Sequence, residues 1–448
     1  MSEPVTDRFL NLYYGSQSVG RLLANAGSTQ FDFAYESAWQ RSGFVLSPHL
    51  PLTGEFTSEE VTCFFQNLLP EGLNLEEIVR ALRLSKTEKF ELLKQIGADA
   101  TGAFILAPDL EPANQMSDRP LPLTELSERL QLRERRNFAV WDQKVRVSVA
   151  GFQDKIGVKV VENQWFLPDG LNNHTSHLLK PPPVHSQFES MVVNEAFCMQ
   201  LSQKVGLATA ETEIVTVPEP VLLVTRFDRM WQNNGLYAKR HVIDGCQLLG
   251  LPPNHKMERP YGATGDVANI RDGASIPKLA GAIRRFSSAP ILDIKAFIEW
   301  VAFQLCIGNV DAHAKNLSFF VDKKSKIRLT PFYDQVCILD FGQMKERLSL
   351  RDTRLDTALS MAIGDEFDLK QIGAYDIALM ADEADLPIKA VVSGFERVAK
   401  AVLQQLDQVD VVDHYQRFDS IKQIINELAE RLLAVLPDVA QAWRDLQA

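Results

Sequence analysis

The 448-residue chain is poor in cysteine, and its few cysteines are not spaced for pairing. There are five, an odd number, at widely scattered positions without a Cys-x-x-Cys pair: Cys63, Cys198, Cys246, Cys306 and Cys337. Disulfide frameworks and zinc sites need even or closely spaced sets of cysteines. We therefore expect reduced residues in the core of a cytosolic protein, without disulfides or a zinc site.

The sequence also lacks a long apolar run and an excess of basic residues. Apolar stretches stay shorter than the roughly 18 residues of a membrane span, and no basic segment followed by an apolar one opens the chain, so we expect neither a span nor a signal peptide. The net charge of -11 argues against a general nucleic-acid binder. With 46% hydrophobic and 23% charged residues, the composition is typical of a soluble globular protein, and without a span or a signal peptide we expect a cytoplasmic location.

Neither a Gly-x-Gly-x-x-Gly string nor a Walker motif is present, but residues 308–316 indicate phosphoryl transfer. Asp311 and Asn316 have the spacing of a kinase catalytic loop, whose Asp accepts the proton of the substrate hydroxyl and whose Asn holds magnesium. Asp334 closes a short, largely apolar run at 327–333 and could supply a second metal ligand. One carboxylate and one amide beside nucleotide phosphates are sufficient protein ligands for Mg²⁺.

The alternative is that Asp311 and Asn316 only cap helices or turns, which is their commoner use. Two features favour the catalytic interpretation. The loop follows residues 297–307, which are apolar nearly all round and predict a buried helix that can hold a polar loop rigidly. His313 and Lys315 then place further donors beside the carboxylate.

The string Gly-Asn-x-Asp-x-His-x-Lys-Asn at 308–316, followed by Leu-Thr-Pro-x-Tyr-Asp at 329–334, resembles the HipA-type toxin kinases. These are the serine/threonine kinase half of a bacterial toxin–antitoxin pair. The resemblance implies that Asp311 is the catalytic base and that Asn316 and Asp334 bind magnesium. It also implies ATP contacts from His313, Ala314, Lys315, Asn316, Tyr333 and Asp334. A literal Asp340-Phe341-Gly342 string lacks the Pro-x-Tyr-Asp context, so we interpret it as a decoy.

Residues 145–160 read as a strand, a small turn and a second strand. A turn of small residues can bring backbone N–H groups against phosphates, although an ordinary hairpin has the same pattern. Ser148 to Lys155 match the Ser-Val-Ala-Gly-x-Gln-(Asp/Glu)-Lys nucleotide loop of the same family. The resemblance implies autophosphorylation at Ser148 and ATP contacts from Ala150, Gly151, Phe152, Gln153, Asp154 and Lys155.

Lys180 ends a short apolar strand, which three prolines prevent from continuing. A lysine in this position pairs with the α- and β-phosphates in kinases, and the family has an ATP-contacting lysine here. Glu195, on a helix expected at 190–204, is a candidate ion-pair partner for Lys180, with a solvent-facing position as the alternative.

The apolar run at 221–224 predicts a buried strand that leads into Thr225-Arg226-Phe227-Asp228-Arg229. In a two-lobed kinase, the strand before the lobe junction presents its backbone to adenine. This segment is similar to the family's Arg-Phe-Asp-Arg hinge, which implies adenine contacts from Thr225, Arg226 and Phe227.

The fold that we predict is α+β, a two-lobed protein-kinase-like fold. Alternating residues at 8–53 favour a small antiparallel sheet, and helical periodicity begins at Ser58, expected as N-cap. We expect an added N-terminal subdomain (1–107), a connector (108–140), a β-rich ATP-binding lobe (141–235) and an all-helical C-terminal lobe (236–448). Two family-like phrases, at 64–72 and 96–103, are interpreted as scaffolding without a chemical role.

The resulting hypothesis is an ATP- and Mg²⁺-dependent serine/threonine protein kinase of the HipA toxin type. The family implies a small helix-turn-helix antitoxin (HipB-like) as partner, contact with operator DNA mainly through that complex, and transcriptional autoregulation. It also implies a translation component, such as an aminoacyl-tRNA synthetase, as protein substrate. Alternatives are a pseudokinase acting as a nucleotide-binding adaptor or co-repressor, and a small-molecule kinase. The intact set Asp311, Asn316 and Asp334 favours activity.

Overall fold

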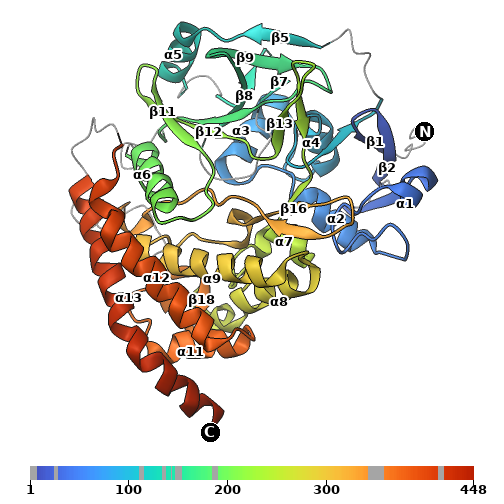
Figure 1. The fold of residues 1–448 in the computed structure, drawn as a ribbon. Helices are drawn as coiled ribbons and strands as arrows, with labels where there is room; N and C mark the ends of the chain where they lie inside the picture. Colours follow the sequence, from blue (N-terminus) through green and yellow to red (C-terminus); the bar gives the residue numbers. More distant parts are fainter. Residues whose placement is uncertain are drawn as a thin grey trace.

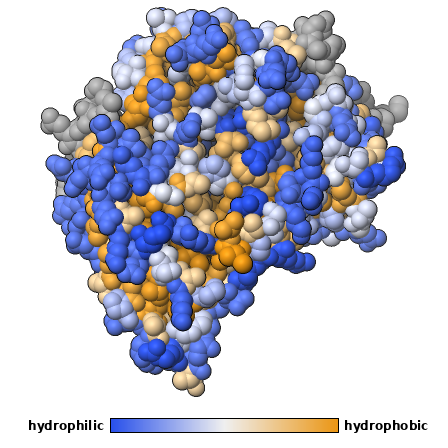
Figure 2. All heavy atoms as spheres, viewed as in Figure 1, coloured by the Kyte–Doolittle hydropathy of each residue, from blue (hydrophilic) through white to orange (hydrophobic). Residues whose placement is uncertain are grey.

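The computed structural model describes residues 8–24, 29–109, 116–133, 138–142, 144–146, 154–183, 190–341, 358–411 and 418–448. A β-rich lobe lies above a mainly helical lobe in Figure 1, and the N-terminal sheet lies beside both. Hydrophilic residues cover most of the face shown in Figure 2. Among the helices that the structure describes, none combines the length and apolar character that a bilayer span requires.

The N-terminal subdomain contains the antiparallel sheet that the sequence predicted. Its strand order is β3-β2-β1-β4, formed by β1 (Arg8–Tyr14), β2 (Gln17–Ala24), β3 (Phe31–Tyr35) and β4 (Phe104–Ala107). Alternate residues such as Leu10 and Leu12 face the core, as the period of a strand requires. Four helices complete the subdomain: α1 (Ser37–Ser42), α2 (Ser58–Gln66), α3 (Gly72–Leu82) and α4 (Lys89–Ile96).

Helix α2 begins one residue earlier than predicted, because Thr57 and not Ser58 is its N-cap. The Glu60 backbone N–H donates to Thr57 Oγ1 (3.2 Å), and the Thr57 N–H donates to Glu60 Oε2 (2.8 Å). Thr and Ser are both good caps, and the Glu three residues after Thr57 completes a capping box only with Thr57.

The N-terminal lobe is built on a six-stranded antiparallel sheet of order β11-β12-β10-β8-β9-β5. Its strands are β5 (Ser117–Pro120), β8 (Ile156–Val161), β9 (Gln164–Asp169), β10 (His177–Lys180), β11 (Thr212–Thr216) and β12 (Pro220–Thr225). Helix α5 (Leu123–Gln131) adds Leu126 to a core with Ile156 and Leu167. Helix α6 (Met191–Lys204) packs on β11 and β12, and Figure 1 shows it between this sheet and the helical lobe. Two short pairs flank the sheet: β6 (Val140–Trp141) with β7 (Lys144–Val145), and β13 (Arg229–Trp231) with β14 (Tyr237–Lys239).

The C-terminal lobe is centred on α9 (Pro290–Ile307), the buried helix expected before the catalytic loop. It is apolar nearly all round, and Phe297, Trp300 and Phe303 are buried. Three helices pack against it: α8 (Ile276–Phe286), α12 (Ile388–Gln405) and α13 (Phe418–Gln447). Helix α7 (Gly245–Leu249) packs on α8, and helix α11 (Ala374–Glu383) packs on α13. Each of the five cysteines is buried and free, as the sequence predicted.

The prediction of an all-helical C-terminal lobe is wrong in detail. The lobe also holds a three-stranded sheet of β15 (Val242–Asp244), β16 (Ser318–Val321) and β17 (Ile327–Leu329), and the pair β18 (Ala358–Ile363) and β19 (Glu366–Asp368). Several of these strands have only three or four residues, too few to show a period of two in the sequence. Strands β15 and β16 nevertheless matter, because they frame the catalytic loop.

Gly308 turns the chain from α9 into that loop. It is the C-cap of α9 with a φ of 69°, the left-handed region in which glycine is favoured. A Cβ at this position would lie 3.2 Å from Leu339 Cδ1 and 3.2 Å from Leu428 Cδ1. The left-handed backbone therefore favours glycine here, and an added Cβ would crowd both leucine side chains.

We expect Gly308→Ala to destabilise the protein by about 1–2 kcal/mol, the cost of a left-handed residue that carries a Cβ. The matched control is Gly281→Ala within α8, where nothing lies within 4 Å of the added Cβ. It should be neutral or stabilise by about 0.5–1 kcal/mol. Urea unfolding followed by circular dichroism measures both; a Gly308→Ala midpoint equal to that of the wild type would contradict the assignment.

Candidate active site

A pocket lies where the N-terminal subdomain and the two lobes meet. Its lining combines apolar side chains with a concentration of charged ones. Leu178, Met191, Val224, Phe227, Val336 and Ile338 are among the apolar residues, and Lys155, Lys180, Glu195, Lys256, Asp311, Lys315, Asn316 and Asp334 among the polar ones. The pocket therefore brings together most of the residues that the sequence singled out, as far as they lie in the described part of the chain.

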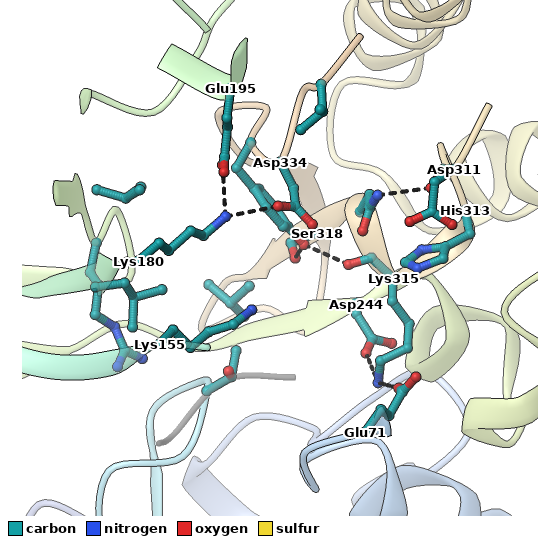
Figure 3. Close-up of a pocket in the computed structure, with 18 of the residues that line it drawn as sticks. Glu71, Lys155, Lys180, Glu195, Asp244, Asp311, His313, Lys315, Ser318 and Asp334 are labelled. Atoms are coloured by element: carbon teal, nitrogen blue, oxygen red, sulfur yellow. Dashed lines mark hydrogen bonds and ion pairs between the residues drawn. The ribbon is translucent and has the colours of Figure 1, made fainter. Parts of the chain in front are cut away.

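Lys180 is the centre of the pocket's ionic network. Its Nζ lies 2.7 Å from Glu195 Oε1 and 2.8 Å from Asp334 Oδ1, and in Figure 3 it points between the two carboxylates. Strand β10 supplies Lys180 from the centre of the sheet and α6 supplies Glu195, while Asp334 comes from the C-terminal lobe. The ion pair predicted for Lys180 and Glu195 therefore exists, and a third residue joins it.

The electrostatics of this cluster keep Lys180 and Asp334 charged and shift the pKa values of Glu195 and Lys155 toward the neutral forms. Burial alone would lower the pKa of Lys180, but Asp334 and Glu195 raise it well above its usual range. Burial alone would raise the pKa of Asp334, but Lys180 and Lys155 hold it well below its usual range. Burial raises the pKa of Glu195, against the effect of Lys180. Burial, and then the charge of Lys180, lowers the pKa of Lys155 to about 8.

The apolar run at 327–333 that Asp334 closes is not one continuous strand. Strand β17 ends at Leu329, and the chain then follows a separate path in which the Phe332 N–H donates to Ala208 O at 2.7 Å. Asp334 itself has a φ of 58°, a left-handed conformation that Asp adopts more readily than most residues and that recurs at functional sites. This turn directs its carboxylate into the pocket toward Lys180.

Asp311 and Asn316 lie on the loop after Gly308. The Asn316 amide nitrogen donates to the Asp311 backbone oxygen at 3.1 Å, which leaves the amide oxygen for a ligand. Asp311 keeps an exposed surface in the pocket. Partial removal of its carboxyl from water nevertheless raises the pKa to about 6, and the charge of Lys256 opposes this shift. His313 is buried, and burial lowers its pKa to about 3, so its ring is neutral beside Asp311.

Lys315 lines the pocket but its ammonium is bound by residues behind the catalytic loop, whereas Ala314 is not among the lining residues. Lys315 Nζ donates to the backbone and side-chain oxygens of Asn67, both at 2.9 Å, and lies 2.9 Å from Asp244 Oδ2. Figure 3 shows its side chain pointing toward Glu71 and Asp244. Ala314 is buried against Gly245 and is not among the lining residues. Both residues hold the loop in place from behind.

The predicted hinge does lie along the pocket. Thr225, Arg226 and Phe227 line it, and the Phe227 ring contacts Tyr333 with the centroids 5.7 Å apart. The N–H groups of Thr225 and Arg226 donate to Glu211 O (2.9 Å) and Ser176 O (3.0 Å). An adenine ring would therefore meet the remaining backbone groups of this segment. The Arg226 guanidinium is held by the Asp228 carboxylate, at 3.0 and 2.9 Å.

Two further predictions concern the nucleotide loop and the Asp-Phe-Gly string. Ser148 and Ala150, Gly151, Phe152 and Gln153 lie outside the described residues; Asp154 and Lys155 lie inside them, and Lys155 lines the pocket. Burial raises the pKa of Asp154. Asp340 is buried outside the lining and accepts a hydrogen bond from Ser420 Oγ at 2.6 Å, which favours the interpretation as a decoy.

The sequence interpretation missed the wall that the N-terminal subdomain contributes. Asn67, Leu68, Glu71 and Thr101 line the pocket, although their two phrases were expected to be scaffolding. Glu71 Oε2 lies 2.8 Å from Lys256 Nζ. The available signal was the presence of polar residues within an otherwise apolar helix end, at Asn67 and Glu71 around Pro70.

Comparisons with known proteins agree with this geometry. The model of the HipA N-terminal domain matches residues 10–107, and the model of the HipA-like C-terminal domain matches residues 147–406. The chain belongs to the HipA family.

Curated relatives align along nearly the whole chain. The serine/threonine-protein kinase toxin HipA of Shewanella oneidensis is 33% identical over 404 residues, 89% of both proteins. The putative kinase Y4mE of Sinorhizobium fredii is 30% identical over 441 residues, 95% of this chain and 98% of the relative. A solved structure of Shewanella oneidensis HipA with HipB and operator DNA superposes with a TM-score of 0.82 at 31% identity, covering 96% of this chain and 99% of that one.

These matches confirm the predicted family, the two-lobed kinase-like fold and the enzyme class, a kinase. They do not bear on the role of any single residue. The roles of Asp311, Asn316 and the lysines therefore rest on the geometry described above.

We expect Lys315→Met to act mainly on stability. The substitution leaves Asp244 and Glu71 without their buried ammonium partner, and breaking such a pair costs about 3 kcal/mol or more. Lys323→Met, at an exposed turn, is the control and should change stability by less than about 0.5 kcal/mol. Urea unfolding of both variants measures this effect. If the midpoint of Lys315→Met equals that of Lys323→Met, the Lys315 cluster contributes nothing to stability.

Proposed function

We propose that this chain is an ATP- and Mg²⁺-dependent serine/threonine protein kinase, the toxin of a HipA/HipB-like pair. The observation that carries the proposal is the convergence of Lys180, Glu195 and Asp334 in the pocket that also holds Asp311 and Asn316. Protein kinases share a few recurring parts: a lysine paired with a helix glutamate, a metal-binding Asp, and a catalytic Asp with its Asn.

The pocket suits a nucleoside triphosphate. Leu178, Val224 and Phe227 offer apolar surface for a base, next to the hinge backbone. Lys155 and Lys180 offer positive charge for phosphates at the other side of this surface. The matching of an apolar region with a cationic one is the arrangement that orients a nucleotide.

The residues also fit magnesium. Asn316 and Asp334 supply amide and carboxylate oxygens, the donor types that Mg²⁺ prefers, and the lowered pKa of Asp334 keeps its carboxylate charged. When bound, the ion would neutralise charge on the nucleotide's phosphates and on the group in transfer.

Asp311 would act on the acceptor. Its carboxylate takes the proton of a serine or threonine hydroxyl as the oxygen forms a bond to the γ-phosphorus and the bond to the ADP oxygen breaks. A pKa near 6 leaves the carboxylate mostly ionised at neutral pH while keeping it basic enough for this task. Asn316, which would hold the metal, is hydrogen-bonded to the Asp311 backbone and so ties the base to that residue.

The proposed partners follow from the family. The solved relative contains HipA, HipB and operator DNA, and this supports a HipB-like helix-turn-helix antitoxin as partner of this chain in the cytoplasm. Operator DNA would be contacted mainly through that complex, giving transcriptional autoregulation. The protein substrate that we propose is a translation component such as an aminoacyl-tRNA synthetase.

We expect Asp311→Asn to reduce phosphate transfer by about 10²–10⁴-fold, the usual contribution of a general base. The matched control is Asp340→Asn, which changes the Asp of the literal Asp-Phe-Gly string and should leave transfer near the wild-type rate. Incubation with radiolabelled ATP and a bacterial lysate measures both variants. Undiminished transfer by Asp311→Asn would refute the base assignment, and nucleotide binding without transfer by the wild type would favour the pseudokinase alternative.

Autophosphorylation at Ser148 is a separate proposal. A phosphate dianion on a residue next to the nucleotide loop would compete with the phosphates of ATP for the same N–H groups, so ATP affinity should fall at least about tenfold. Peptide mass spectrometry after incubation with ATP should find phosphate on Ser148 and none in Ser148→Ala. A phosphorylated sample that binds ATP like the unmodified protein would contradict this inhibition.

A further inference from the structure

Lys256 lies in the pocket without an assigned role. It follows the short 3₁₀ turn Pro253–His255, and its backbone oxygen accepts a hydrogen bond from the Ala314 N–H at 3.0 Å. This contact fixes its backbone to the loop that carries Asp311. Its ammonium lies 2.8 Å from Glu71 Oε2, and Lys256, Glu71 and Asp311 all line the pocket.

Three other cations of the pocket, Lys180, Lys315 and Arg226, are themselves buried and paired. Lys180 is bound by Glu195 and Asp334, and Lys315 by Asn67 and Asp244. Arg226 is bound by Asp228. Displacing Lys315 or Arg226 toward a ligand would leave its acid partners unpaired, which is strongly unfavourable, and Lys180 can meet phosphates only at the place where its two carboxylates already hold it.

The pair of Lys256 and Glu71 differs because both side chains keep contact with solvent. Their exposed fractions are 24% and 22%. Partly exposed ion pairs contribute little to stability, so the ammonium can exchange its carboxylate partner for a more highly charged one. Glu71 can remain with Lys315, whose Nζ lies 3.3 Å from Glu71 Oε1.

Among the described residues that act on Asp311, negative charges outnumber positive ones. His313, the neighbouring ring in the loop, is buried and neutral. Asp334 and Glu71 both act on Asp311 as negative charges, and Lys256 is the cation that opposes them. A phosphoryl group in transfer passes beside the base and carries negative charge on three oxygens, which a nearby cation stabilises.

We propose that Lys256 is a catalytic residue that contacts the γ-phosphoryl group, with Glu71 of the N-terminal subdomain as the positioning residue that holds its ammonium in the pocket before the nucleotide binds. The proposal rests on the proposed kinase function. It assigns to the N-terminal subdomain a part in arranging the reaction centre.

Nucleotide binding separates this role from a structural one. In the full chain, with Mg²⁺, we would titrate ADP and a non-hydrolysable ATP analogue by calorimetry. Lys256→Met should bind the analogue about tenfold more weakly and ADP unchanged, because only the analogue carries the third phosphate. Lys256→Arg should restore most of the difference. The control Lys295→Met, on an α9 side chain that is 70% exposed, should match the wild type.

Steady-state transfer supplies the second readout. Lys256→Met should lower kcat on the order of 10²-fold, as removal of one transition-state contact does, and Lys256→Arg should recover much of it. An equal loss of affinity for both nucleotides, or none for either, would overturn the proposal. If the wild type transfers no phosphate but Lys256→Met still loses selectivity for the third phosphate, the contact stands and the kinase function fails.

Discussion

The arrangement of the pocket depends on one buried ammonium group shared by two carboxylates. Lys180 reaches both Glu195 and Asp334, which belong to a helix of the N-terminal lobe and to a turn of the C-terminal lobe. A charge removed from water must be paired, so the lobes cannot separate here without exposing the ammonium or leaving it unpaired. The same constraint sets the position of Asp334 relative to the loop of Asp311 and Asn316, on which the proposed chemistry depends.

The N-terminal subdomain is joined to the rest of the molecule by polar contacts of the same kind. Asp99 lies 2.8 Å from Arg229, directly after the hinge, and Lys315 is bound by Asn67 behind the catalytic loop. Hydrogen bonds from Gln247 Nε2 to Phe64 O (3.0 Å) and from Lys239 Nζ to Phe104 O (2.8 Å) continue this interface. Buried polar contacts require one particular alignment, so the subdomain fixes both the hinge and the loop.

The sequence predicted those parts of the site that local chemistry specifies. The spacing of Asp311 and Asn316, and Lys180 at a strand end set by prolines, can be read without a structure. The direction of Lys315 cannot, because a long side chain beside a pocket can turn to either side, and its partner Asn67 is far away in the chain. The wall around Glu71 was missed for the same reason, and the short strands β15 and β16 because three or four residues show no period.

A crystal structure of the chain with a non-hydrolysable ATP analogue and Mn²⁺, located by its anomalous signal, tests the central claim most directly. The account predicts the metal ion between the phosphates and the oxygens of Asn316 and Asp334, with Lys180 against the phosphates and Asp311 facing the terminal one. A metal ion held by other residues, or a nucleotide bound in a different cleft, would contradict it.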